Sequence, residues 1–277
     1  MIINCLIGEV NFQFIVHSLK MISQLQKYQS EAEGDVVIKV VFTSTLPSLP
    51  NEKIISSTFY EIYQGECLYQ KQMTADKQTL GIIVYHENNA TIYIDEKFKT
   101  FASEYLMCEY AFLYFVFKRK KGILIHSSSF AYQGNGYLLV ASSGTGKSTH
   151  ADLWRKYCNV TTINDDKNLI LLKDNQLLIY PNPFSGKSLI DNNLIVPLKG
   201  IVLLSRGKNA ASKVKPKDGF IKLLPHILNT SFMLAKEIWD EVTDKILSSV
   251  NFYALSCDIS QEAVLTLKKV LEDDYEI

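Results

Sequence analysis

Residues 137–149 read YLLVASSGTGKST, and this stretch decides the fold that we expect. Its apolar start predicts a buried strand, and helix-forming residues run from Ser148 to about Tyr157 after a glycine-bearing loop. The loop matches the phosphate-binding pattern G-x-x-x-x-G-K-[ST] except at its first position, where Ala141 replaces glycine. A strand, such a loop and a helix in this order predict an α/β domain that binds the phosphates of a nucleotide.

The residue types of this loop have chemical reasons. Gly144 and Gly146 let the backbone turn, so that several N–H groups point toward phosphate oxygens. Lys147 is expected to reach the β- and γ-phosphates, and Ser148 to offer its hydroxyl to Mg²⁺. The candidate nucleotide-binding residues of the loop are Ser143, Gly144, Thr145, Gly146, Lys147, Ser148 and Thr149. A chance match is the alternative, and the strand–loop–helix setting favours function.

Two carboxylates follow the next apolar stretch. Asp165 and Asp166 follow Asn164, directly after residues 160–163, which predict a strand. At a strand end beside a phosphate-binding loop, one carboxylate can hold the metal while the other accepts a proton from an attacking hydroxyl. The alternative is a surface turn closed by asparagine and aspartate. We expect a catalytic pair, and the residues alone leave open which aspartate has which role.

His126 and Lys187 are further candidates for the same site. His126 follows the apolar run 123–125, one hairpin upstream of the loop, where a histidine is often only structural. Lys187 lies in the stretch PNPFSGKS, residues 181–188, whose proline and glycine predict an ordered loop. That loop would deliver Lys187 to a phosphate or to an acceptor, and a solvated lysine is the alternative. The stretch lacks the upstream glycine of a second phosphate-binding loop.

The chain predicts two domains. Residues 1–100 carry short β-branched or aromatic runs separated by turns, which indicates a small β-rich accessory domain. Residues 101–277 predict an α/β domain with a mixed sheet, beginning with a helix over 101–120. Its last helix is expected to be opened by Asp258, with Gln261 three residues further on.

The composition limits the classes of binding partner that we expect for this protein. In 277 residues, 29 Lys and Arg balance 29 Asp and Glu, which argues against binding to nucleic acid or to a membrane by bulk charge. The five cysteines form no close pair, the N-terminus does not resemble a signal peptide, and the most apolar run, 105–117, is too short to span a bilayer. We therefore expect a cytoplasmic protein with reduced thiols.

Three of the basic residues are arginines, Arg119, Arg155 and Arg206, and lysine supplies the others. A coding bias is one explanation, and a local need for a planar, forked donor is the other. Arg206 closes a predicted strand and is the arginine expected to contact phosphate, with Arg155 a weaker candidate.

Several motifs follow one another in an order that resembles a known family. They are His126, the G-x-G-K-S-T loop, residues 164–167, residues 183–187, residues 196–200 and the strand that leads to Arg206. The order resembles bacterial kinases related to the catalytic domain of HPr kinase/phosphorylase, whose P-loop fold is shared with ATP-dependent phosphoenolpyruvate carboxykinase. The resemblance covers about residues 120–277 and is most specific over 126–206.

This resemblance implies that ATP and Mg²⁺ are used to phosphorylate a serine hydroxyl. It implies Asp165 as the base, Asp166 and Ser148 at the metal, and His126 orienting the base or touching the γ-phosphate. The Arg-Gly signature that HPr kinases carry after their aspartate pair is not visible here, so neither HPr as substrate nor the phosphorylase reaction is implied. Relatives of this family often form oligomers, so the resemblance makes a homo-oligomer one option, and the residues leave the oligomeric state open.

Three functions remain open. The first is a serine or threonine kinase for a protein or peptide. The second is a kinase for a free amino acid or hydroxy acid, and the third is a nucleotide-dependent switch that transfers no phosphate. The aspartate pair favours an enzyme, because a switch needs only one carboxylate at its metal.

Overall fold

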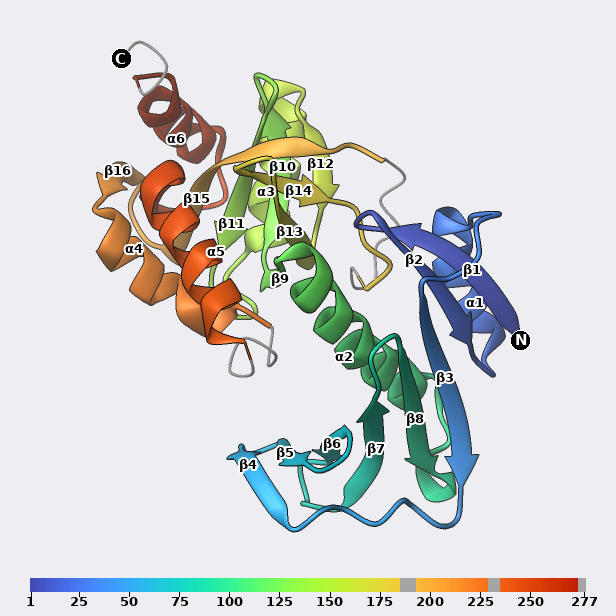
Figure 1. Ribbon diagram of the computed structural model, residues 1–277. Helices are drawn as coiled ribbons and strands as arrows, with labels where there is room; N and C mark the ends of the chain where they lie inside the picture. Colours follow the sequence, from blue (N-terminus) through green and yellow to red (C-terminus); the bar gives the residue numbers. More distant parts are fainter. Residues whose placement is uncertain (185–192, 229–234, 274–277) are drawn as a thin grey trace. The chain divides into compact units, whose positions relative to one another are not determined.

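The computed structural model describes residues 1–184, 193–228 and 235–273, and the chain divides into two units, Met1–Val116 and Phe117–Ile277 (Figure 1). Each unit contains a mixed sheet and helices, so the predicted mixed α/β class is confirmed. The division falls inside α2 (Phe101–Lys120), whereas the sequence analysis divided the chain after residue 100. That these units are an accessory domain and a phosphate-binding domain stays a prediction.

The first unit contains an eight-stranded sheet in the order β1-β2-β3-β8-β7-β6-β5-β4. Its strands are β1 (Ile2–Ile7), β2 (Val10–Ile15), β3 (Val36–Thr43), β4 (Glu52–Ser56), β5 (Tyr60–Gln64), β6 (Leu68–Met73), β7 (Thr79–Tyr85) and β8 (Asn89–Asp95). The short helices are α1 (Leu19–Leu25), η1 (Gln26–Tyr28) and η2 (Glu96–Phe98).

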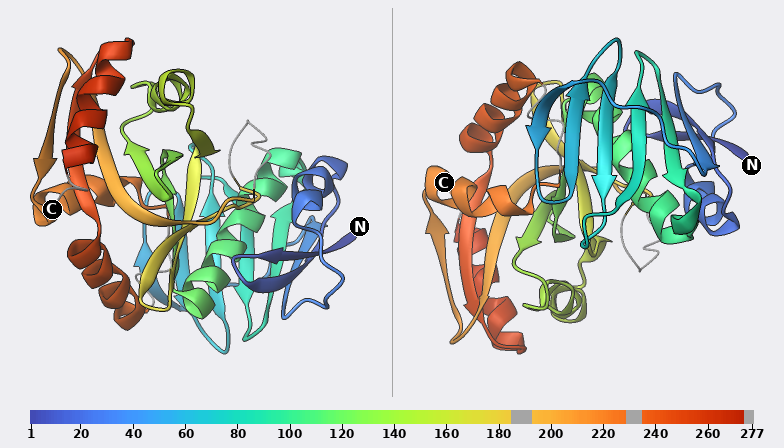
Figure 2. Two further views of the ribbon diagram at one scale, coloured as in Figure 1. Left: turned by 90° about the horizontal axis from the view of Figure 1, so that it is seen from above. Right: turned by 90° about the horizontal axis from the view of Figure 1, so that it is seen from below.

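Helix α2 lies across one face of this sheet (Figure 2). Its aromatic residues make the contact, because the rings of Phe112 and Phe12 are 5.2 Å apart and those of Tyr114 and Tyr85 are 4.2 Å apart. This packing explains why most of α2 belongs to the first unit.

The second unit is built on nine strands of the described residues, with the path β12-β10-β11-β15-β14-β13-β9, with β17 beside β15 and with β16 beside β17. The strands are β9 (Gly122–His126), β10 (Ser128–Tyr132), β11 (Asn135–Val140), β12 (Thr161–Asn164), β13 (Lys167–Lys173), β14 (Gln176–Tyr180), β15 (Val196–Arg206), β16 (Ala210–Val214) and β17 (Asn251–Cys257). The helices are α3 (Lys147–Cys158), α4 (Pro216–Leu223), η3 (Leu224–His226), α5 (Lys236–Ser249) and α6 (Gln261–Asp273).

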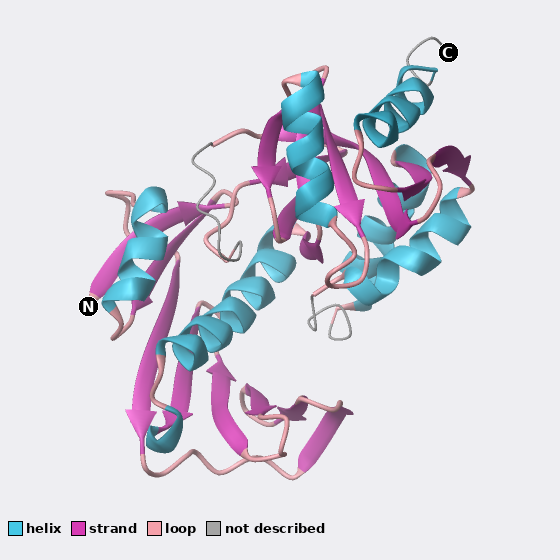
Figure 3. Cartoon of the chain, turned by 180° about the vertical axis from the view of Figure 1, so that it is seen from behind, coloured by secondary structure: helices cyan, strands magenta, loops and turns pink. Residues whose placement is uncertain are grey.

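Alternation along the central strands builds two apolar cores. On β11, Leu138 and Val140 join residues of α4 and α5, whereas Tyr137 and Leu139 join residues of α3 and α6. Figure 3 shows α3 and α6 among the helices of this unit, and α3 contacts β10 and β11. Both faces of the central sheet are therefore covered.

The strand directions bring the candidate residues to one edge of the sheet. Strand β11 is parallel to β15, which is parallel to β17, so the carboxyl ends of all three meet at this edge. Strand β12 is antiparallel to β10, which is antiparallel to β11, so β12 also ends there. Ligands of open α/β sheets bind at such carboxyl ends.

Among the described residues, no helix is long and apolar enough to cross a membrane.

Candidate functional site

The candidate phosphate-binding loop, residues 141–146, has the backbone that its glycines predict. It joins β11 to α3, with φ of 76° at Gly144 and 118° at Gly146. No described heavy atom lies within 4 Å of a Cβ built on either glycine, so the need for glycine is conformational rather than steric. Ala141 is buried and its φ is outside this left-handed region, which explains why alanine fits the first position of the pattern.

Helix α3 begins directly after the loop, with Gly146 as its N-cap residue. The first backbone N–H groups of a helix have no partners within it, and they carry the positive end of its dipole. The N–H group of His150 donates to the carbonyl of Gly146, which closes the first turn. The turn therefore directs the N–H groups of Lys147, Ser148 and Thr149 toward the end of the helix that would receive a phosphate.

Lys147 is the first residue of α3 and is buried, with 7% of its surface exposed. Its Nζ donates to the carbonyl oxygen of Ala141 at 2.9 Å, which folds the side chain back over the loop. Burial lowers the pKa of Lys147, and the charge of Asp166 opposes this shift. An ammonium group has three donors, so this contact leaves capacity for an anion.

The two aspartates follow β12 and have different surroundings. The pKa of Asp165 is raised to about 6, mainly by burial and also by the carboxylates of Asp166 and Asp152, while a hydrogen bond from the backbone lowers it. Asp166 instead lies beside two basic residues, because its Oδ1 is 3.5 Å from Nδ1 of His126 and its charge acts on Lys147. The pair therefore consists of one carboxyl whose pKa is raised and one that lies near Lys147 and His126.

Ser148 lies next to this pair. Its Oγ donates to the carbonyl oxygen of Asp165 at 3.4 Å and is 3.5 Å from Oγ of Ser128. Ser128 Oγ donates to the same carbonyl at 2.7 Å. The hydroxyl of Ser148 is thus brought to the end of β12, as the sequence pattern of a magnesium-binding loop requires.

A buried polar network under the aspartates was missed by sequence reasoning. Ser129 Oγ donates to Oδ1 of Asn168 at 2.5 Å, and Asn168 Nδ2 donates to the carbonyl of Ser127 at 2.7 Å. Asn164 Oδ1 accepts from the backbone N–H of Asp165 at 2.8 Å. The signal was available as three consecutive serines, 127–129, between two apolar strands. Satisfied buried networks of this kind hold a backbone in one conformation.

The structure brings a second histidine to His126. Residues 227 and 228 lie beside β9, where Ile227 bridges Ile125 and the N–H of Leu228 donates to the carbonyl of Leu124. Burial lowers the pKa of His226, and so does the charge of Lys147. Burial also lowers the pKa of His126, followed by the charge of Lys147. Both imidazoles are therefore neutral at neutral pH, and the sequence carried no signal for His226.

Arg206 contacts the loop itself. Its Nε donates to the carbonyl of Thr145 at 3.2 Å and its Nη2 to the carbonyl of Gly144. These contacts hold the loop backbone, and the expected contact of Arg206 with phosphate stays a prediction. Lys187 lies outside the described residues, and before it Asn182 Nδ2 donates to the carbonyl of Lys167 at 3.0 Å.

Arg206→Ala should weaken binding of Mg·ATP by roughly three- to tenfold, because two hydrogen bonds worth about 1 kcal/mol each no longer fix the loop. Arg206→Lys should not restore the affinity, since a lysine lacks the forked geometry. Calorimetric titration of the purified chain measures this. Arg155→Ala is the matched control, because Arg155 pairs with Asp152 on the surface of α3. Equal affinities of the Arg206→Ala variant and the wild type would contradict the role.

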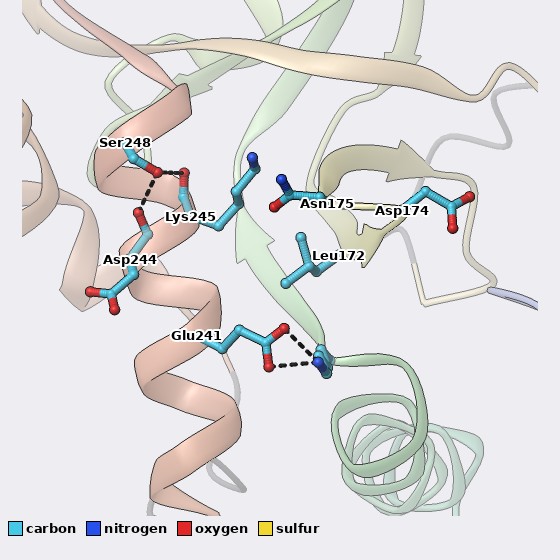
Figure 4. A pocket seen from close by; sticks show the side chains of 8 residues that line it. Leu172, Asp174, Asn175, Glu241, Asp244, Lys245 and Ser248 are labelled. Carbon is cyan, nitrogen blue, oxygen red and sulfur yellow. Dashed lines mark hydrogen bonds and ion pairs between the residues drawn. The ribbon is translucent and has the colours of Figure 1, made fainter.

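Two further observations concern the other places where a ligand or a metal ion could bind. A pocket of about 500 Å³ lies between the β13–β14 turn and α5 (Figure 4), and none of the described candidate residues lines it. Two of its charged residues, Lys121 and Glu241, pair with each other. Among the described residues, no three His, Cys, Asp or Glu side chains gather closely enough to hold a metal ion by themselves.

A family model and a solved structure match parts of this chain. The family model for the SynChlorMet cassette protein ScmC matches residues 97–218, which contain the candidate residues from His126 to Arg206. A solved structure, the Hpr(Ser) kinase/phosphatase from Coxiella burnetii, is 11% identical with a TM-score of 0.36, over 55% of this chain and 90% of that chain. These values are too low to extend its activity to this chain. No curated protein matches the sequence.

Proposed function

We propose that the chain is an ATP- and Mg²⁺-dependent kinase of the HPr kinase-like P-loop type, which transfers the γ-phosphate to a serine or threonine hydroxyl of a protein or peptide. The observation that supports this most is the meeting of the loop, Lys147 and two aspartates at one edge of the sheet. The order of motifs from His126 to Arg206, which resembles that of HPr kinase-related proteins, also supports it.

The proposed nucleotide-binding residues follow from the loop. Residues 143–149 would surround the phosphates with backbone N–H groups, and Lys147 would place its charge on the β- and γ-phosphates. His126 and His226, both neutral, would face the transferred phosphate or the acceptor as hydrogen-bonding groups. Lys187 remains a proposed contact to phosphate or acceptor.

The residues present fit a magnesium ion. Mg²⁺ prefers oxygen ligands and is usually held by one or two carboxylates together with substrate phosphates. The hydroxyl of Ser148 and the carboxylate of Asp166 are oxygen donors at the end of β12 and the start of α3, and they would hold the ion. When bound, it would neutralise charge on the phosphates.

Asp165 is the proposed base. Its carboxylate takes the proton of the acceptor hydroxyl while that oxygen bonds to the γ-phosphorus and the bond from phosphorus to the leaving oxygen of ADP breaks. A base whose pKa is about 6 is ionised at neutral pH and still accepts a proton readily. The contact of His126 with Asp166 favours the reversed assignment, with Asp166 as base, as the second candidate.

The pH profile of kcat/KM should show an acid limb near pH 6. The base is active when ionised, and its raised pKa means that ionisation is lost as the pH falls through about 6 rather than about 4. Initial rates measured between about pH 5 and pH 8 give the profile. Histidines also titrate in this range. Asp152→Asn removes one charge that raises this pKa, so it should move the limb to lower pH. A limb that stays at its position in that variant would argue against Asp165.

Two alternatives stay open. A small-molecule kinase would phosphorylate free serine or a hydroxy acid, and a switch would bind Mg·ATP without acceptor-dependent turnover. Incubation with γ-labelled ATP and candidate peptides, proteins and free amino acids, followed by mass spectrometry of the product, tests all three. Candidate acceptors include proteins encoded beside this one, because the matching family model is named for a cassette protein.

A further inference from the structure

A pocket of about 520 Å³ lies beside the phosphate-binding loop, and neither Asp165 nor Asp166 lines it. Its lining comes from the loop and α3, from the end of β15, and from the end of β17. The residues are Thr145, Gly146, Thr149, His150, Leu153, Leu204, Arg206, Gly207, Cys257, Asp258 and Ile259. Because it shares Thr145 and Gly146 with the loop, a ligand whose phosphates lie on the loop can continue into this pocket.

The walls of the pocket suit an uncharged ring. Leu153 and Leu204 are apolar, and Ile259 lines the pocket while 75% of its own surface is exposed. A large apolar side chain so exposed gains from being covered by a flat, apolar ligand face. Arg206 lines both this pocket and a neighbouring one of about 470 Å³ along residues 142–145, so its planar guanidinium lies where phosphate and ring would join.

His150 is a second observation that points to a ligand. Its side chain lines the pocket, only 3% of its surface is exposed, and Nε2 has no hydrogen-bond partner among the described residues. Burial lowers the pKa of His150 to about 4, so the ring is neutral at neutral pH. A buried neutral imidazole without a partner is costly unless a ligand group completes it.

The carboxylate of Asp258 lines the pocket and disfavours the binding of a phosphate group there. Asp258 accepts hydrogen bonds from Nδ2 of Asn209 at 3.1 Å and from Oγ of Ser260, and these bonds lower its pKa. It is therefore ionised at neutral pH and repels anions. Hydroxyl or amino donors, such as those of a ribose or a base, are the groups that an ionised carboxylate binds.

We propose that this pocket binds the nucleoside part of the donor nucleotide, with the ring against Leu153, Leu204 and Ile259 and with Asp258 accepting from a hydroxyl or amino group. The inference rests on the proposed function, because it needs a triphosphate on residues 143–149. Affinity then divides between the loop, which holds phosphates, and the pocket, which holds the nucleoside.

Titration of the full chain with Mg·ATP and with Mg·tripolyphosphate tests whether the affinity for ATP comes partly from the pocket and partly from the loop. The wild type should bind ATP at least about tenfold more tightly than tripolyphosphate. Leu153→Trp should fill the pocket and weaken the binding of ATP by about tenfold. The affinity for tripolyphosphate should stay within about twofold of the wild-type value. Leu265→Trp is the matched control, because Leu265 is 45% exposed on α6 and does not line the pocket.

Ile259→Ser is a second variant of the pocket, which keeps the test valid if Leu153→Trp misfolds. The side chain of Ile259 is mostly exposed, so its replacement should leave the fold intact. This variant should bind ATP roughly threefold more weakly than the wild type and bind tripolyphosphate with unchanged affinity. Equal affinity of the wild type for ATP and tripolyphosphate would overturn the pocket and leave the phosphate-binding loop standing. The same would follow if both pocket variants bound ATP like the wild type. Failure of the wild type to bind either ligand would overturn the proposed function and this inference together.

Discussion

Asp165→Asn is expected to abolish phosphate transfer and to stabilise the folded chain. An amide cannot accept the acceptor's proton, so kcat should fall by about 10²- to 10⁴-fold. The carboxyl in the folded chain has its pKa raised from 3.8 to about 6, which means that the ionised form is disfavoured by folding. Replacing it by a neutral isostere removes this cost.

The size of this stabilisation depends on pH. A group whose pKa is raised on folding favours the folded state fully below the unfolded value of 3.8, and that contribution is lost as the pH rises through about 6. At neutral pH the variant should therefore be more stable, by about 1–2 kcal/mol after allowing for partial exposure. This corresponds to a rise of about 2–6 °C in Tm, which should vanish toward pH 4.

Transfer assays and thermal melts of the same preparation measure both effects. Asp166→Asn is the comparison, because its carboxylate lies near His126 and Lys147 and is the proposed metal ligand. It should raise the Mg²⁺ concentration needed for half-maximal rate, whereas Asp165→Asn should not be rescued by Mg²⁺. If the two variants behaved in the opposite way, the roles of the aspartates would be reversed.

Lys147→Met has the second large expected effect, which is on nucleotide binding. Methionine keeps the length and apolar stem of the buried side chain but removes the charge that would meet the β- and γ-phosphates. Mg·ATP should bind at least about 100-fold more weakly. Stability should change little, because the lost hydrogen bond to Ala141 is offset by removal of a charge whose pKa is lowered by burial.

Lys156→Met is the control for this variant, since Lys156 is exposed on the same helix and lies outside the loop. Calorimetry gives the affinities and circular dichroism checks the fold. A Lys147→Met chain that bound Mg·ATP as the wild type does would show that this lysine does not hold phosphate.

Local patterns with one physical explanation predicted the fold around the site well. The expected strand at 137–140 is β11 (Asn135–Val140), and the expected helix from Ser148 to about Tyr157 is α3 (Lys147–Cys158). The predicted helix over 101–120 is confirmed as α2. These elements are set by neighbouring residues, through apolar runs, glycines with positive φ and basic residues at helix ends.

One local detail was wrong. The last helix begins at Gln261, and Ser260 rather than Asp258 caps it, since Oγ of Ser260 accepts from the N–H of Ala263 at 3.3 Å. Asp258 is engaged with Asn209, 49 residues away, and with Ser260. A capping pattern in sequence does not reveal such a competing tertiary partner.

The rest of the site depended on contacts between distant segments. His226 comes near Lys147 only because residues 227 and 228 lie beside β9. Asn168 reaches Ser127 and Ser129 because β13 and β10 both begin at the network. Arg206 was expected at a phosphate, and its contact with Gly144 and Thr145 follows from the parallel pairing of β11 and β15.

The transfer of labelled γ-phosphate from ATP tests the central claim most directly. The purified chain is incubated with Mg·ATP and a set of synthetic peptides that each carry one serine or threonine, and the product is located by mass spectrometry. We predict Mg²⁺-dependent label on a serine or threonine hydroxyl, and none with the Asp165→Asn chain. Tight binding of Mg·ATP with no label on any peptide, protein or amino acid would contradict the account and favour a nucleotide-dependent switch.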